Sequence, residues 1–214
     1  MRGERLSHLV SLDSLKLAAG MVLLSPYIPL LFMGEEYGET AYFPYFVSHS
    51  DPKLVEAVRQ GRKAEYAAFH TGDPPDPQSE RTFRSAKLDH SLKKEGSHHV
   101  LWEFYKELIR LRKELPVLSN LSKDGLEVRG NMKQNVLLVR RRADESEALI
   151  GYNFSDRAAV MVLPLTEGNW KKLIDSSEEG REGMGSSIPE EVYSDGEINL
   201  SLNPKSMVLF VNEE

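Results

Sequence analysis

Two adjacent carboxylates, Glu35 and Glu36, are the residues best placed for chemistry in this sequence. They follow an apolar run, Leu30–Met33, and a glycine. A short continuous apolar run predicts a strand buried on both faces of a parallel sheet. Side chains at the carboxyl end of a barrel strand line the ligand site. We therefore expect Glu35 or Glu36 to hold a ligand or, alternatively, to fix the loop, for example through an arginine.

Aromatic residues cluster just after this carboxylate pair, at Tyr37, Tyr42, Phe43, Tyr45 and Phe46. Sugars stack on aromatic faces, so the cluster predicts a sugar subsite; the alternative is a loop that packs on the rim of a barrel. Arg62 follows a glycine in a predicted helix. It is a candidate to bind a sugar hydroxyl or a loop carboxylate, and otherwise an ordinary surface arginine.

Several other classes of site are not predicted. The chain has no cysteine, which excludes disulfides and thiolate metal sites. His98 and His99 are adjacent rather than one helical turn apart, so they do not form a zinc pair. No glycine-rich phosphate loop follows a predicted strand. The net charge of −6 argues against a nucleic-acid partner.

Three helices are expected before residue 116. The first runs from about Ser11 to Leu24, with Ser11 or Asp13 as its cap, and is apolar on most sides. The second begins at Asp51-Pro52 and ends near Phe69. A proline-rich loop is expected over residues 71–80. The third is capped by Ser97 and ends at Glu114, before Leu115-Pro116.

The hydrophobic period changes after residue 116. Short strands separated by turn residues predict an antiparallel sandwich or sheet. They cover residues 136–139, 148–152, 160–163, 197–202 and 207–211. Residues 176–187 are polar and glycine-rich, so a mobile loop is expected there. On the strands, Tyr152, Phe154, Trp170 and Tyr193 are candidates for a sugar platform, although core packing is the favoured interpretation.

A membrane or targeting segment is not expected. The apolar stretch Leu17–Met33 is interrupted by Ser25-Pro26 and by Pro29. Each uninterrupted piece is shorter than the roughly 20 residues that a membrane span needs. A secretory signal would have its apolar core nearer Met1 and a small-residue cleavage site after it. The absence of cysteine is compatible with a cytoplasmic location, which is our expectation.

The sequence thus predicts an α/β region followed by an all-β region. Residues 1–116 contain only one convincing parallel strand, whereas a complete (β/α)₈ barrel needs about 250 residues. We therefore expect residues 1–116 to be an incomplete, C-terminal end of a (β/α)₈ barrel with its last strand and helices. Residues 117–214 are expected to form the C-terminal β-sandwich domain.

Several motifs resemble one glycoside hydrolase family. Residues 23–38, LLSPYIPLLFMGEEYG, resemble the last barrel strand and following loop of the α-amylase superfamily. Later segments narrow this resemblance to one family within the superfamily. These segments are YFVSH (45–49), DP (51–52), GR (61–62), DPQ (76–78), FYKELIRLR (104–112) and NFS (153–155). Together they are similar to the malto-oligosyltrehalose trehalohydrolases.

This resemblance implies a reaction, and it also implies that the carboxylates which carry out that reaction are missing from this chain. The family hydrolyses the α-1,4 bond that joins a terminal trehalose to a maltooligosaccharide, with retention and without a metal or organic cofactor. Its three acting carboxylates lie upstream of the matching segments. The family's Asn-His-Asp motif is absent, and the similar Asp89-His90 lies in the wrong place. Since adjacent residues in an extended chain point to opposite sides, Glu35 and Glu36 cannot form the carboxyl pair of a retaining glycosidase.

We therefore assign no catalytic residue and no metal ligand to this chain. The residues expected to bind a maltooligosaccharide-type substrate in the intact enzyme are Glu35, Glu36, Tyr37, Phe43, Tyr45 and Arg62. The chain by itself is expected to be inactive. Two alternatives remain open. One is a non-catalytic split subunit that associates with the missing N-terminal half or with a second copy, because an incomplete barrel leaves open edges. The other is a carbohydrate-binding module.

Overall fold

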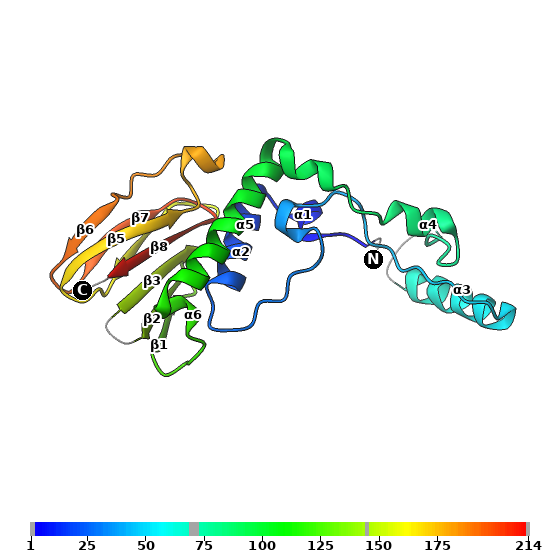
Figure 1. The fold of residues 1–214 in the computed structure, drawn as a ribbon, viewed down its shortest axis with the longest axis horizontal. Helices are drawn as coiled ribbons and strands as arrows, with labels where there is room; N and C mark the ends of the chain where they lie inside the picture. Colours follow the sequence, from blue (N-terminus) through cyan, green and yellow to red (C-terminus); the bar gives the residue numbers. More distant parts are fainter. Residues whose placement is uncertain (1–2, 69–72, 144–145, 213–214) are drawn as a thin grey trace.

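The computed structural model describes residues 3–68, 73–143 and 146–212. Its α-helices precede its strands (Figure 1). The α-helices are α1 (Leu6–Leu9), α2 (Leu12–Leu23), α3 (Pro52–Ala67), α4 (Glu80–Ser85), α5 (Gly96–Glu114) and α6 (Pro116–Ser119). The 3-10 helices are η1 (Glu35–Tyr37), η2 (His90–Lys94) and η3 (Glu179–Arg181).

The strands form two antiparallel sheets. They are β1 (Leu126–Asn131), β2 (Val136–Ala143), β3 (Ser146–Asn153), β4 (Ala159–Leu163), β5 (Gly168–Asp175), β6 (Glu191–Ser194), β7 (Ile198–Leu202) and β8 (Ser206–Asn212). The larger sheet has the order β1-β2-β3-β8-β5-β6, and β4 pairs with β7 in the smaller one. In the large sheet, β8 lies between β3 and β5 and is therefore one of its two central strands.

An inter-sheet core packs the small sheet against one face of the large sheet. Side chains that point to one side of a strand alternate with those that point to the other. Burial in β4 follows this alternation: Ala159, Met161 and Leu163 are buried, and Val160 and Val162 are exposed. The inter-sheet core consists mainly of Val136, Leu138, Leu149, Met161, Leu163, Trp170, Leu200, Leu202, Val208 and Phe210.

A helix-side core covers the opposite face of the large sheet. It joins α2 and α5 to the alternate residues of β3 and β8, so both strands are buried on two faces (Figure 1). Its main members are Leu17, Leu23, Leu101, Phe104, Leu108, Leu111, Ala148, Ile150, Tyr152, Met207, Leu209 and Val211. The helices and the sheet thus share one core across the predicted boundary at residue 116, and that boundary stays a prediction.

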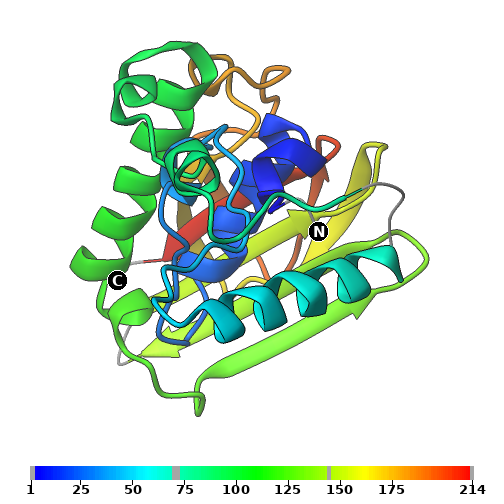
Figure 2. The same ribbon diagram turned by 90° about the vertical axis from the view of Figure 1, so that its right-hand side faces the viewer.

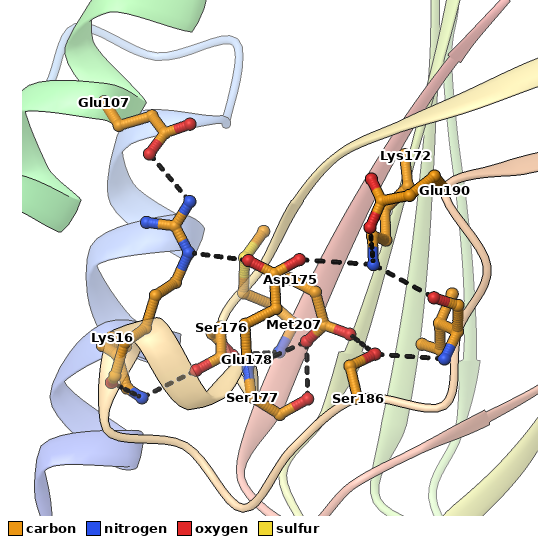
Figure 3. Close-up of polar contacts among 12 residues, drawn as sticks. Lys16, Glu107, Lys172, Asp175, Ser176, Ser177, Glu178, Ser186, Glu190 and Met207 are labelled. Carbon is orange, nitrogen blue, oxygen red and sulfur yellow. Dashed lines mark hydrogen bonds and ion pairs between the residues drawn. The ribbon is translucent and has the colours of Figure 1, made fainter.

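Polar contacts also join the helices to the sheet, through what we call the polar clip (Figure 3). The clip consists of Lys16, Lys172, Asp175–Glu178, Arg181, Ser186 and Glu190. The Lys16 side chain is fully buried on α2, and its ammonium donates to the carbonyl oxygens of Ser176 and Arg181 at 2.6 and 2.9 Å. Within the clip, Ser176 and Ser177 are themselves buried. The predicted loop over residues 176–187 is therefore held against α2 by buried hydrogen bonds.

On β5, the second lysine of the clip is also buried. The Lys172 ammonium donates to the Ile188 carbonyl oxygen at 3.0 Å and pairs with Glu178 and Glu190 at 3.2 and 2.9 Å. Burial alone would lower the pKa of Lys172, but the two carboxylates outweigh it and hold that pKa above its ordinary value. Arg181 adds an ion pair to Glu107 on α5, at 2.8 Å.

Helices α3 and α4 form an arm, defined here as residues 44–68 and 73–86. In Figure 1 the arm lies at the opposite end of the molecule from the strands, and Figure 2 shows α3 in front when viewed from that end. Tyr66 is the buried residue of α3, and Thr82 that of α4. The remainder of α3 is partly or fully exposed, so the arm has little core of its own.

Most predicted elements are confirmed. The helices predicted at 11–24, 51–69 and 97–114 correspond to α2, α3 and α5, and the five predicted strands correspond to β2, β3, β4, β7 and β8. The Ser11 and Asp51 side chains accept from the amides of Ser14 and Lys53, as N-caps do. The Ser97 cap is wrong, because α5 begins at Gly96. Phe69, Thr71 and Gly72 lie outside the described residues.

Leu30–Met33 does not form the predicted buried strand within this chain. The segment is not a strand, and Leu30, Phe32 and Met33 are 91%, 43% and 51% exposed. A strand of a parallel sheet needs hydrogen-bonded neighbours, and the described residues offer none beside this segment. Within the described ranges, no helix has both the length and the apolar character to cross a membrane.

Candidate functional site

The loop after Leu30–Met33 has a fixed, compact conformation. Gly34 and Gly38 flank η1 with φ of +87° and +68°, a region that glycine adopts without the strain of a Cβ. A Cβ on Gly34 would also lie 2.7 Å from the Cβ of Glu39. Glu35 and Glu36 therefore sit on a 3-10 turn, and the extended geometry assumed for them from the sequence is wrong.

Glu39 is the centre of this loop and was missed by the sequence analysis. Its carboxylate is 1% exposed and accepts from the amides of Thr40 and Ala41, both at 2.8 Å. It also accepts from the Tyr37 hydroxyl at 3.0 Å and from the Asp89 amide at 2.7 Å. Burial alone would raise the pKa of Glu39, but these hydrogen bonds outweigh it and the pKa is lowered.

Residues 3–8 hold the outer edge of the loop. The Arg5 guanidinium donates to the carbonyl oxygens of Ala41 and Met33, each at 2.6 Å. The Ser7 hydroxyl donates to the Glu39 carbonyl at 2.8 Å, and the His8 ring bonds the Thr40 carbonyl at 2.9 Å. Both ends of the loop are thus tied to one short helix, α1, and to the residues just before it.

The Arg5 side chain is buried between aromatic rings. Its guanidinium carbon lies 5.0 Å from the centre of the Phe32 ring and 5.9 Å from that of Phe43. The Nη2 atom is buried and has no hydrogen-bond acceptor within the part of the chain that the structure describes. Cation–π contact with the two rings therefore replaces the missing hydrogen bond.

Glu35 is engaged with the protein itself. Its carboxylate accepts from the Tyr105 hydroxyl on α5 at 3.1 Å and from the Phe32 amide at 3.0 Å. Burial, and then the Glu35 charge, raise the pKa of the Tyr105 hydroxyl. The structure therefore favours the alternative in which Glu35 fixes its own loop, with a tyrosine as its partner rather than an arginine.

Glu36, in contrast, keeps its carboxylate available. It is partly exposed, and it has no hydrogen bond or ion pair to any residue that the structure describes. A carboxylate held on a rigid loop without a protein partner can accept hydrogen bonds from a ligand's hydroxyl groups. Nowhere in residues 3–68, 73–143 and 146–212 do three or more His, Asp or Glu side chains come together as metal ligands.

The predicted aromatic residues occupy different environments. Tyr37 is fully buried with its hydroxyl on Glu39, so its predicted contact with a ligand is not favoured by this geometry. Phe43 is half-buried beside the loop. Tyr45 is 47% exposed on the arm, and the Arg62 guanidinium lies 4.9 Å above its ring. The structure thus brings Tyr45 and Arg62 together, separately from Glu35 and Glu36.

No protein-family profile matches this chain, but curated proteins do. It is 47% identical over 118 residues to a malto-oligosyltrehalose trehalohydrolase of Saccharolobus solfataricus, a match that covers 55% of this chain and 19% of that protein. It is 35% identical over 188 residues to the Deinococcus radiodurans protein of the same name, covering 85% of this chain and 30% of that protein.

The chain corresponds to a C-terminal part of a malto-oligosyltrehalose trehalohydrolase. The resemblance found in the sequence motifs is thereby confirmed. The matched region spans between 19% and 30% of the length of these two trehalohydrolases.

Solved structures of α-amylase-type proteins are similar to this chain. A crystal structure from Salmonella typhimurium, provisionally described as an alpha amylase, matches with a TM-score of 0.75 and 29% identity. The match covers 99% of this chain and 32% of that one. The alpha-amylase of H. orenii matches with a TM-score of 0.56 at 17% identity, over 95% of this chain and 36% of that one, which shows the fold alone.

The sugar platform considered for the strands of this chain is wrong. Tyr152 and Trp170 are 2% and 0% exposed and belong to the helix-side core and the inter-sheet core. Only Tyr193, 63% exposed, offers an open ring on these strands among the four candidates. The favoured interpretation, core packing, is confirmed for Tyr152 and Trp170.

The Tyr105 contact gives a testable prediction for the loop that carries Glu35 and Glu36. Replacing Tyr105 by phenylalanine removes the hydrogen bond to Glu35, and a hydrogen bond to a charged group contributes about 1.5 kcal/mol. We expect Tyr105→Phe to lower the free energy of unfolding by that amount in urea titration. The matched control is Tyr193→Phe, whose hydroxyl contact to Glu167 is exposed. Equal losses in the two variants would contradict the assignment.

Proposed function

We propose that this chain is the C-terminal portion of a glycoside hydrolase that releases trehalose from maltooligosyltrehalose by cleaving an α-1,4 bond. The relatives named malto-oligosyltrehalose trehalohydrolase support this substrate. The local role is supported by the Glu36 carboxylate, which is partly exposed and has no hydrogen-bond or ion-pair partner among the described residues. The loop that carries it is fixed by Glu39 and Arg5. In this role Glu36 accepts hydrogen bonds from sugar hydroxyls at the rim of the active site.

The exposed segment at residues 28–33 supports the barrel part of this proposal. Ile28 and Leu30 are 84% and 91% exposed although both are strongly apolar. Exposed apolar patches of this kind mark surfaces that are covered in the complete assembly. We assign the segment to the last strand of a (β/α)₈ barrel whose other strands lie outside this chain, with residues 117–214 as the following β-sandwich domain.

The proposed chemistry needs a pair of carboxylates, which the loop around Glu35 and Glu36 does not offer. A retaining glycosidase uses two carboxyl groups about 5–5.5 Å apart, one of them as nucleophile. Glu35 is occupied by Tyr105 and the Phe32 amide, which leaves Glu36 as the single available carboxylate of the loop. We propose that Glu36 binds substrate, that the acting acids come from elsewhere in the intact enzyme, and that no metal or organic cofactor takes part.

Trehalose release by the purified chain tests this proposal. Incubation with maltooligosyltrehalose is expected to give no trehalose. Adding the Deinococcus radiodurans relative truncated before its matching region is expected to restore release. In the restored enzyme, Glu36→Gln should raise KM about tenfold, because one hydrogen bond to a charged group contributes about 1.5 kcal/mol. Glu191→Gln, an exposed residue on β6, is the control.

Two results would overturn the proposal. One is robust trehalose release by the chain alone that disappears when a carboxylate within these residues is changed. The other is a restored enzyme in which Glu36→Gln and Glu191→Gln behave alike, since that would remove Glu36 from the binding site.

The exposed apolar segment also favours a second function, that of a non-catalytic split subunit. Tyr27, Ile28, Leu30 and Met33 are all more than half exposed. The partner would be a separate chain with the remaining barrel strands, or a second copy of this one. Light scattering that gives a monomer, both alone and with the truncated relative, would exclude this function.

A further inference from the structure

A cavity on the arm lies away from the Glu36 loop. We call it the arm pocket; it has a volume of about 590 Å³ and is lined by Phe46, Val47, Ser48, Gln78, Ser79, Glu80 and Phe83. It is formed between the extended chain that leads into α3 and the start of α4. Its volume is within the range of small-molecule binding sites, about 300–1,000 Å³.

Hydrogen bonds fix the two walls of the arm pocket to each other. The Val47 amide donates to the Pro77 carbonyl at 2.8 Å. The Gln78 side chain bonds His49 twice, accepting from its amide at 3.2 Å and donating to its carbonyl at 2.8 Å. The pocket therefore keeps its shape without a ligand, which lowers the entropic cost of binding.

A second set of contacts holds the wall that contains Gln78 to α3. Asp76 accepts from the Arg59 guanidinium at 3.0 and 2.9 Å. This paired guanidinium, and then the Gln78 amide, hold the pKa of Asp76 below its ordinary value. Asp76 is therefore ionised at neutral pH, and its pairing with Arg59 supports the pocket under the conditions of a binding experiment.

The lining suits an uncharged ligand with hydroxyl groups. Phe46 and Phe83 supply aromatic carbon, and the hydroxyls of Ser48 and Ser79 supply donors and acceptors. The single ionisable group of the lining, Glu80, pairs with Arg84 at 2.6 Å. The lining itself offers no unpaired countercharge to an ionic ligand, whereas a sugar can use both the rings and the hydroxyls. The Lys87 ammonium, outside the lining, lies 5.5 Å from the centre of the Phe83 ring.

Aromatic rings connect the arm pocket with the Glu36 loop. Phe32 lies edge-on to Phe43 with ring centres 5.1 Å apart, and Phe43 lies edge-on to Phe46 at 5.8 Å. Phe46 in turn meets Phe83 at 5.3 Å. Phe32 and Phe83, at the ends of this row, are 43% and 45% exposed. A continuous aromatic row therefore runs from the loop to the pocket.

We propose that the arm pocket is a further subsite for an α-1,4-linked glucan, which extends from the Glu36 loop along this aromatic row. The pocket binds a glucosyl unit against the surface that the touching rings of Phe46 and Phe83 form, away from the bond that is cleaved. The identity of the sugar rests on the proposed function, whereas the pocket itself stands on the geometry of the arm.

Calorimetric titration of the chain with maltoheptaose tests this subsite. Phe83→Ala is expected to raise the dissociation constant about tenfold, because stacking on one aromatic ring strengthens binding by roughly a factor of ten. The matched control is Leu54→Ala, whose side chain is 44% exposed on the same arm and lies outside the lining. Cellohexaose, with β-1,4 bonds, is expected not to bind.

A second variant separates loss of the pocket from loss of the fold. Ser48→Trp fills the cavity and leaves both phenylalanines in place, and it should weaken binding as Phe83→Ala does. Circular dichroism of each variant checks that the arm still folds. Equal affinity of wild type, Phe83→Ala and Ser48→Trp would overturn the subsite, as would no maltoheptaose binding at all.

These experiments distinguish failure of the arm-pocket subsite from failure of the proposed function. If Glu36→Gln weakens maltoheptaose binding and Phe83→Ala does not, the arm pocket is excluded while the role of the loop stands. If Phe83→Ala weakens binding and the restored enzyme releases no trehalose, the subsite stands and the proposed reaction is wrong.

Discussion

Replacing Lys16 by methionine is expected to lower the free energy of unfolding by about 4 kcal/mol, because it removes a fully buried ammonium group. That group donates to the carbonyl oxygens of Ser176 and Arg181 and pairs with Asp13 at 2.9 Å. Methionine has a similar length but cannot donate. The two carbonyl oxygens would then stay buried without partners, and such groups cost about 1–3 kcal/mol each.

Urea unfolding followed by circular dichroism measures this loss. Lys94→Met is the control, because Lys94 is exposed at the end of η2. Amide hydrogen exchange should also become faster in residues 176–187 of Lys16→Met. A loss below about 1 kcal/mol would show that the polar clip contributes little to the docking of the helices on the sheet.

Replacing Glu39 by glutamine is expected to lower the free energy of unfolding by about 3 kcal/mol. The Glu39 carboxylate receives four hydrogen bonds, two on each oxygen. Glutamine would turn an NH₂ group toward two of these donors, so at least two buried hydrogen bonds are lost. Because Glu39 fixes the loop, the amides of Thr40, Ala41 and Asp89 should also exchange faster in Glu39→Gln.

The lowered pKa of Glu39 gives this prediction a pH signature. A carboxyl group with a lowered pKa in the folded state stabilises the protein fully above its ordinary value of 4.5, and this stabilisation is lost as pH falls through the folded pKa. The stability difference between wild type and Glu39→Gln should therefore shrink below that value. Urea midpoints of both proteins from about pH 7 to pH 3 measure it, with Glu182→Gln as the control. A difference independent of pH would contradict the role of the Glu39 charge.

Local sequence signals determined the main helices and most of the strands. Asp51-Pro52 places a cap and a proline where a helix begins, and α3 starts there. Alternation of apolar and polar residues predicts β4 and β7, whose outer faces are exposed. These elements are predictable because each depends on residues within a few positions along the chain.

Strand β5 was missed because its burial pattern depends on distant partners. Lys171 and Lys172 interrupt the apolar pattern, and a lysine ordinarily indicates an exposed position. Lys172 is nevertheless 5% exposed, because Glu178, Glu190 and the Ile188 carbonyl compensate its charge. No local pattern shows that a lysine will find these partners.

The candidate site, too, was predicted in part from the sequence and decided in part by the tertiary structure. The sequence by itself determined the family resemblance and drew attention to Glu35, Glu36 and the aromatic cluster after them. Only the tertiary structure decided that Glu35 is bound by Tyr105, that Glu36 is available, and that Glu39 fixes the loop. The physical reason is distance along the chain: the contacts from Asp89 and Tyr105 to this loop join residues 50 and 70 positions apart, so only the folded chain brings them together.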